Sequence, residues 1–172
     1  MLAEILAASF HSRGGINDWI YPLLRLGIYE DLRNRLNSSS PYYVCLVATI
    51  PTTPRASCGD YLAGTVEMAL RSHYPWFFGG KAGYPYLSNL AVHQDYRRQG
   101  AAAQLLLRCE RVALSWGFQD LYLHVLENNH QARSLYSKLG YKLHQIDGSW
   151  SSLFGQPRRL LLRKRLDAPS TH

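Results

Sequence analysis

Residues 86–103 read Tyr-Leu-Ser-Asn-Leu-Ala-Val-His-Gln-Asp-Tyr-Arg-Arg-Gln-Gly-Ala-Ala-Ala. The apolar residues predict a strand that ends near His93, and the small residues after Gly100 predict the first turn of a helix. Arg97 and Arg98 fall in the short loop between the two elements. This pattern is typical of a phosphate cradle, because free N–H groups and the helix dipole favour an anion there. It lacks the glycines of a Walker A loop or a dinucleotide fingerprint, and a basic loop before a helix also occurs without a ligand.

The remaining elements are predicted from hydrophobic periodicity and capping residues. Gly100 to Trp116 is the clearest helix, because its apolar residues form one stripe and Gly117 ends it. Asn129 can cap a helix that Gly140 ends. Further helices are predicted over 2–10 and 19–36, and strands over 42–50, 61–70, 84–93, 121–126, 141–146 and 158–166. The order ααβββαβαββ predicts an α/β (α+β) fold with a mixed sheet.

Length and composition predict a single globular domain. The chain has 172 residues, of which 47% are hydrophobic and 18% are charged, so it can bury a core. We expect one domain over residues 1–166 and a short tail over 167–172. No stretch approaches the roughly 20 apolar residues of a membrane span. The first residues carry Glu4 and no basic segment, so we do not expect a signal peptide.

The three cysteines, Cys45, Cys58 and Cys109, show no spacing typical of a disulfide framework or of a zinc site. We therefore expect no metal, and a soluble protein of a reducing compartment, either a cytoplasm or a plastid stroma. The net charge of +7 indicates a basic surface that attracts nucleic acid or a phosphorylated cofactor. No nucleic-acid-binding motif accompanies the C-terminal basic residues, so a nucleic-acid partner is not expected.

Two motifs in order resemble the GNAT superfamily of acetyltransferases. Arg97-x-x-Gly100-x-Ala102 is similar to that family's pyrophosphate-binding signature. The second motif is Asn129-x-x-Ala132-x-x-x-Tyr136-x-Lys138-x-Gly140-Tyr141. The motifs cover about residues 84–142, and the element order extends the resemblance over most of the chain. The resemblance implies a mixed, mostly antiparallel sheet that is splayed at its centre and flanked by about four helices.

The resemblance also implies that acetyl-CoA is the acetyl donor. In that family the strand before the signature carries a bulge, and the pantetheine arm pairs with it like an added strand. Asn129, which can also serve only as a helix cap, would bond the arm. The full set of cofactor-binding residues implied is Leu90, Ala91, Val92, Arg97, Arg98, Gln99, Gly100, Ala101, Ala102, Ala103, Asn129, Ala132 and Tyr136.

The chain departs from the family pattern at its start. No strand is predicted before the first helix, where the family has one. Either the chain is trimmed relative to the family, or its sheet starts one strand short.

Acetyl transfer to an amine needs a neutral amine, a stabilised oxyanion and a proton donor for the departing thiolate. Tyr136 suits the last task, because a phenol with a pKa near 10 stays protonated at pH 7. It lies one turn beyond Ala132, on the stripe that faces the strands. Without the motif, a core tyrosine at a helical apolar position would be the favoured interpretation of Tyr136.

Three residues are candidates for activating the amine. His124 lies in an apolar strand, where a histidine is commonly a core residue. However, Leu123-His124-Val125-x-x-x-Asn129 resembles the N-terminal acetyltransferases of this superfamily, in which a catalytic histidine or glutamate occupies this place. The same resemblance implies that Tyr86 helps to order the water through which the proton leaves. Glu67 is the other candidate base, with an exposed strand carboxylate or an arginine partner as its structural alternatives.

The acceptor is less constrained than the donor. An α-amine has a pKa near 8, whereas lysine has a pKa near 10.4, so a histidine base is better matched to protein N-termini. Residues 19–32 and 86–92 also resemble the cyanobacterial and plastid branch, whose members acetylate lysines, N-termini or arylalkylamines. The alternatives are therefore a protein N-terminal or lysine acetyltransferase, a small-amine N-acetyltransferase, or a non-catalytic acyl-CoA-binding domain. We expect a monomer or homodimer.

Overall fold

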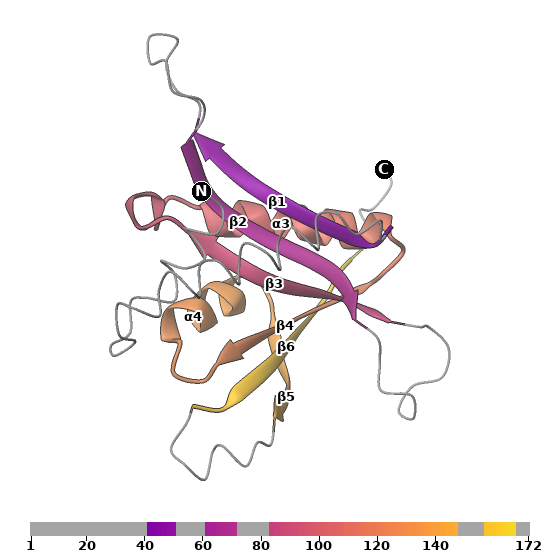
Figure 1. Cartoon of the computed structure of the whole chain (residues 1–172). Coiled ribbons are helices and arrows are strands. Elements are labelled where there is room, and N and C mark those ends of the chain that lie inside the picture. Colours follow the sequence, from indigo (N-terminus) through magenta and orange to yellow (C-terminus); the bar gives the residue numbers. More distant parts are fainter. Residues whose placement is uncertain (1–40, 51–60, 72–82, 148–156, 168–172) are drawn as a thin grey trace, which may run out of the picture. The chain divides into compact units, whose positions relative to one another are not determined.

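The computed structural model describes residues 41–50, 61–71, 83–147 and 157–167 (Figure 1). In this part of the chain the elements follow the predicted order from the first strand onward. They are β1 (Tyr43–Ile50), β2 (Tyr61–Arg71), β3 (Tyr84–Val92), the 3-10 turn η1 (Gln94–Tyr96), α3 (Ala101–Ser115), β4 (Asp120–Leu126), α4 (His130–Lys138), β5 (Lys142–Asp147) and β6 (Arg159–Arg165). The helices predicted over 2–10 and 19–36 lie outside the described residues, as do most of the loop 71–83 and the segment around Trp150 and Phe154.

The six strands form one hydrogen-bonded sheet in the order β1-β2-β3-β4-β6-β5. β3 and β4 run parallel, with Tyr86 opposite Tyr122 and Leu87 opposite Leu123. β6 lies between β4 and β5 and is antiparallel to both. The sheet is therefore mixed, as the sequence predicts. None of the helices in these ranges combines the length and apolarity of a membrane span.

The chain divides into two compact units, and β2, β3 and α3 contribute to both. The described part of the first unit holds β1, the start of β2, the end of β3 and the start of α3. Its strands approach closely at Gly64, where a Cβ atom would lie 2.9 Å from the carbonyl oxygen of Ala91. His93 N donates to the Ala63 oxygen at 2.8 Å beside this contact. A side chain at position 64 would therefore force the strands apart.

The second unit holds the rest of β2 and β3, most of α3, and β4 to β6. Alternation along β4 buries Leu121, Leu123 and Val125 and leaves Tyr122 and His124 on the opposite face. Against this core α3 carries one buried charge, Glu110, which the predicted apolar stripe does not include. Lys164 Nζ lies 2.7 Å from both of its carboxylate oxygens, so the buried charge is paired.

Four of the basic residues near the C-terminus lie against the protein's own carboxylates. Arg158 makes a two-pronged contact with Glu127, at 2.7 and 2.8 Å. Lys164 pairs with Glu110, as described above. Asp120 pairs with Arg163 at 2.9 Å and lies 3.9 Å from Arg165. Pairing of these cations reduces the positive potential that this segment offers to an external anion. The expectations of a single domain and of no nucleic-acid partner remain predictions.

Candidate active site

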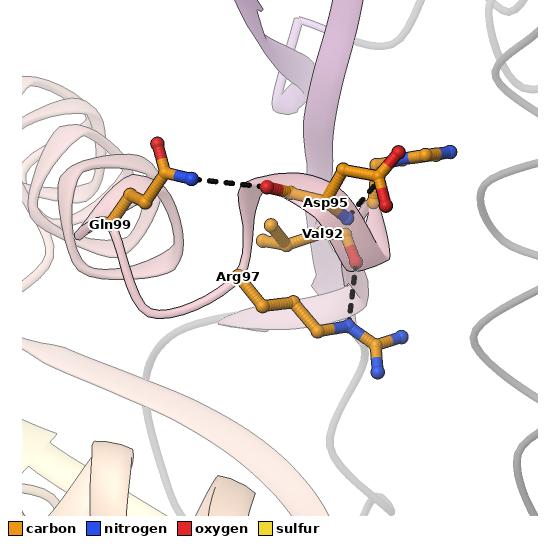
Figure 2. A network of polar contacts seen from close by, with 5 residues as sticks. Val92, Asp95, Arg97 and Gln99 are labelled. Atoms are coloured by element: carbon orange, nitrogen blue, oxygen red, sulfur yellow. Dashed lines mark hydrogen bonds and ion pairs between the residues drawn. The ribbon is translucent and has the colours of Figure 1, made fainter.

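The first unit contains the turn predicted to bind an anion, and side-chain hydrogen bonds fix its path (Figure 2). Arg97 Nε donates to the Val92 carbonyl at 3.1 Å, and Gln99 Nε2 donates to the Asp95 carbonyl at 3.0 Å. The backbone is left-handed at Arg98 and at Gly100, with φ values of 66° and 88°. These contacts turn the chain sharply between the end of β3 and the start of α3.

The N-terminus of α3 fits a pyrophosphate by the chemistry of its donors. Helical hydrogen bonding begins with Gln104 N, which donates to the Gly100 carbonyl at 3.0 Å, so the preceding N–H groups have no acceptor within the helix. A Cβ atom at Gly100 would meet nothing within 4 Å, which leaves space beside the backbone. Arg98 is exposed, and three small residues, Ala101 to Ala103, follow. An anion can therefore approach the N–H groups of residues 98–103 closely.

A second irregularity lies in β3, at Asn89, whose φ is 52°. Left-handed backbone inside a strand interrupts its pairing, and asparagine tolerates this conformation better than most residues do. Asn89 Nδ2 donates to Glu67 Oε1 at 2.7 Å, and Tyr43 Oη donates to Glu67 Oε2 at 3.1 Å. Glu67 is only 1% exposed, so it is not the exposed strand carboxylate that was one structural alternative. Its carboxylate braces the bend of β3 instead.

The second unit brings together two of the candidate site residues, Tyr86 and His124, in direct contact, whereas the sequence interpretation assigned Tyr86 only to ordering a water. Tyr86 lies opposite Tyr122 on the neighbouring strand, and His124 is two residues further on the same face of β4. Tyr86 Oη is 2.9 Å from His124 Nδ1. The guanidinium carbon of Arg71 lies 3.7 Å from the centre of the Tyr86 ring, on its face. The two predicted residues therefore form one hydrogen-bonded pair with a cation beside it.

Asp147, which no sequence motif singles out, contacts Nε2, the other ring nitrogen of His124. Its Oδ2 lies 3.0 Å from His124 Nε2, a hydrogen-bonding distance, although Nε2 lacks the direction of a well-formed hydrogen bond. Burial lowers the pKa of His124, the nearby charges of Arg159 and Arg71 lower it further, and Asp147 opposes them. With a pKa below its ordinary value, the ring is neutral near pH 7.

Tyr136 projects from α4 into the core of the second unit. It is 8% exposed, and its ring meets that of Tyr141 edge to face with centroids 5.8 Å apart. Burial, and to a lesser extent Tyr86, raises the pKa of Tyr136 to about 12. Asn129 caps the same helix, because its Oδ1 accepts a hydrogen bond from Ala132 N at 3.3 Å. The capping role of Asn129 is therefore realised, and its Nδ2 group can still donate to a ligand.

A pocket of about 390 Å³ lies at the starts of β3 and β4 in the second unit. Its aromatic lining includes Tyr84 and Tyr122, whose rings meet edge to face at 5.0 Å, and Phe118. None of the predicted site residues lines this pocket. In the part of the chain that the structure describes, no cluster of three or more His, Cys, Asp and Glu side chains is arranged to hold a metal ion.

Comparisons with known proteins give the context for these features. A family model described as "Acetyltransferase (GNAT) family" matches residues 17–141. GCN5-related N-acetyltransferase 10, chloroplastic, of Arabidopsis thaliana is 31% identical over 166 residues, which are 94% of this chain and 65% of the relative. Thialysine N-epsilon-acetyltransferase of Bos taurus is 33% identical over 111 residues, which are 64% of this chain and 62% of the relative. The chain thus spans less than two thirds of the length of each of these relatives.

A solved structure with low sequence identity to this chain has a similar fold. The PaiA N-acetyltransferase of Thermoplasma acidophilum, in complex with coenzyme A, matches with a TM-score of 0.68 at 20% identity. The match covers 95% of this chain and 90% of the other.

The brace between Asn89 and Glu67 gives a test of stability. Asn89→Asp keeps the size and backbone tolerance of the residue but places a second carboxylate beside Glu67. We expect a loss of about 2–4 kcal/mol at pH 8, because a charge-assisted hydrogen bond is replaced by repulsion. The repulsion acts only while both carboxylates are ionised, so the loss of stability grows as the pH rises from 5 to 8. Urea unfolding of the wild type and the variant at pH 5 and pH 8 measures this loss of stability.

Asn89→Gly is the matched control for this substitution. It also removes the hydrogen bond and accepts a positive φ, but it adds no charge, so its loss should vary with pH much less than that of Asn89→Asp. An equal, pH-independent loss in Asn89→Asp would contradict the brace.

Proposed function

The chain belongs to the acetyltransferase (GNAT) family, and from this premise we propose that it is an acetyl-CoA-dependent N-acetyltransferase that acts on primary amines. The observation that carries the proposal is the turn at residues 97–103, with open space at Gly100 and helical N–H groups without an intrahelical acceptor. This is a site for a diphosphate, at the position where the sequence matches the family's signature.

We assign cofactor binding to residues of each unit, taken separately. In the first unit, the N–H groups of Arg98 to Ala103 hold the pyrophosphate, while Arg97 keeps the turn closed through the Val92 carbonyl. Beyond the left-handed residue Asn89, we assign pairing with the pantetheine arm to backbone groups of Leu90, Ala91 and Val92. In the second unit, the residues that we assign to the cofactor are Asn129, Ala132 and Tyr136. The bound cofactor supplies an acetyl thioester.

Tyr136 stabilises the departing thiolate by donating a hydrogen bond. With a pKa of about 12 it stays protonated at every physiological pH. Complete transfer of its proton to a thiolate, whose conjugate thiol has a pKa near 8.5, is uphill by about 3–4 pKa units, or roughly 5 kcal/mol. The buried phenol therefore acts as a hydrogen-bond donor to developing charge, a role that burial strengthens.

Tyr86 and His124 remove the proton from the acceptor amine. Their 2.9 Å contact and the lowered pKa of His124 supply a neutral ring that can accept a proton near pH 7. Glu67 is the weaker candidate for this role, because both of its oxygens already accept hydrogen bonds from Tyr43 and Asn89. We assign it to positioning the bend in β3.

Protein N-terminal α-amines are the acceptors that we favour, and lysine ε-amines are the next. Near pH 7.4 an α-amine is already neutral to roughly tens of per cent, whereas a lysine is neutral only to about one part in a thousand. The second candidate function is acetylation of a small-molecule amine, and the similarity to thialysine N-epsilon-acetyltransferase favours it. The aromatic pocket at Tyr84 and Tyr122 is compatible with either acceptor.

We propose the plastid stroma as the compartment in preference to a bacterial-type cytoplasm. The relatives described as chloroplastic, including the one that matches 94% of this chain, support this choice. A monomer or homodimer stays a prediction.

Gly100→Asp tests the anion site. The substitution places a negative charge where the diphosphate would bind, and we expect the affinity for acetyl-CoA to fall at least 100-fold in calorimetry. Gly100→Asn is the matched control, because it has the same shape and tolerates a positive φ but carries no charge. Its affinity should fall much less. Equal affinities for acetyl-CoA in the two variants would show that the diphosphate does not bind at this turn.

Tyr136→Phe tests the hydrogen-bond donor. It should leave the affinity for acetyl-CoA within about twofold and lower kcat by about 10²-fold, because one donor to developing charge is lost. Tyr141→Phe is the control, since it deletes a hydroxyl from the neighbouring and equally buried tyrosine. Steady-state kinetics with a peptide acceptor measures both variants. An unchanged kcat in Tyr136→Phe would return this residue to a purely structural role.

A further inference from the structure

His124 lies between two oxygen atoms, one on each ring nitrogen. Tyr86 Oη is 2.9 Å from Nδ1, and Asp147 Oδ2 is 3.0 Å from Nε2. A neutral imidazole carries its hydrogen on one nitrogen only, so the two contacts decide which tautomer forms. The side chains of His124 and Asp147 are 15% and 32% exposed, so water only partly screens them.

The Asp147 carboxylate decides which ring nitrogen of neutral His124 carries the hydrogen. Ionised Asp147 is only an acceptor, and a bare Nε2 lone pair at 3.0 Å from it would place two acceptors in contact. Such a contact is unfavourable, whereas an Nε2 hydrogen makes it attractive even when the N–H direction is imperfect. Nδ1 is then the acceptor, and the Tyr86 hydroxyl must be the donor to it. The Tyr86 oxygen keeps its lone pairs for a further donor.

We propose that Asp147 is a positioning residue that fixes His124 as the Nε2–H tautomer and makes Tyr86 the group that receives the proton of the acceptor amine. The proposal rests on the proposed function. In the step, the amine N–H bond breaks and an O–H bond forms on Tyr86. The original Tyr86 O–H bond breaks and an N–H bond forms at His124 Nδ1. The resulting imidazolium lies against the Asp147 carboxylate, and no electron is gained or lost.

Because of the charges around His124, the stability of its protonated ring depends on Asp147. Among the described residues, two groups contact the ring, Tyr86 on β3 and Asp147 on β5, and two further charges act on it, Arg71 on β2 and Arg159 on β6. Burial and both arginines disfavour the protonated ring, and Asp147 is the charge that favours it. Without Asp147 the imidazolium would meet only cations and a phenol among these groups. The pKa of His124 would therefore fall further.

Nitrogen-15 NMR of the histidine rings tests this assignment without relying on turnover. Nδ1 and Nε2 shifts report the tautomer, and a His124→Gln spectrum assigns the signal. We expect the Nε2–H form in the wild type and in Asp147→Glu. Asp147→Asn should show a mixture of tautomers and a titration midpoint at least about one pH unit lower. Tyr86→Phe should keep the Nε2–H form, because Asp147 remains.

Kinetics then separate positioning from a purely structural role. In Asp147→Asn the acid limb of kcat/KM for a peptide acceptor should move to lower pH with the histidine, and the plateau should fall about tenfold or more. The KM for acetyl-CoA should stay unchanged. Asp167→Asn removes an exposed carboxylate of the same charge and should alter neither quantity.

An Nδ1–H tautomer in the wild type, or an unchanged tautomer and midpoint in Asp147→Asn, would overturn the proposal. A wild type that transfers no acetyl group to any amine would instead overturn the proposed function, and the NMR result would still decide the role of Asp147.

Discussion

The bend of β3 depends on one buried hydrogen bond, from Asn89 Nδ2 to Glu67 Oε1 at 2.7 Å. A strand bends at low cost only where a residue accepts left-handed backbone and its side chain finds a partner. Glu67 provides that partner because it is buried and also held by Tyr43. The bend directs the end of β3 into the turn at Arg97 to Gly100, and so presents the start of α3 to an anion. We therefore propose that Glu67, a candidate base, serves the site by shaping its backbone instead.

Burial shifts the pKa values of His124 and Tyr136, both in the second unit, in opposite directions. It lowers the pKa of His124, which keeps the ring neutral, and raises that of Tyr136 to about 12, which keeps the phenol protonated. One group is thereby prepared to accept a proton and the other to donate a hydrogen bond at the same pH. In the proposed step the proton reaches His124 through Tyr86, and the carboxylate of Asp147 balances the charge that appears on the ring.

The sequence predicts features that are encoded locally. Alternation along β4, the stripe of α3 and the cap at Asn129 depend on neighbouring residues, and the structure agrees with them within a residue or two. Tyr86 and His124 were identified as candidate site residues only through a family resemblance, and their direct contact was not predicted. Asp147 could not be predicted, because its place depends on β6 inserting between β4 and β5 and on a register shift between Leu143 and Gln145. The burial of Glu67 is likewise a tertiary property.

The proposed function requires that this chain bind acetyl-CoA through the backbone between β3 and α3. The most direct measurement is a titration of acetyl-CoA into nitrogen-15-labelled protein, followed by the shifts of assigned backbone amides. We expect saturable binding, with the largest shifts at residues 98–103, where the N–H groups would contact the diphosphate, and further shifts at residues 90–92. Saturable binding that leaves residues 98–103 unshifted, or no binding at all, would contradict the proposed function.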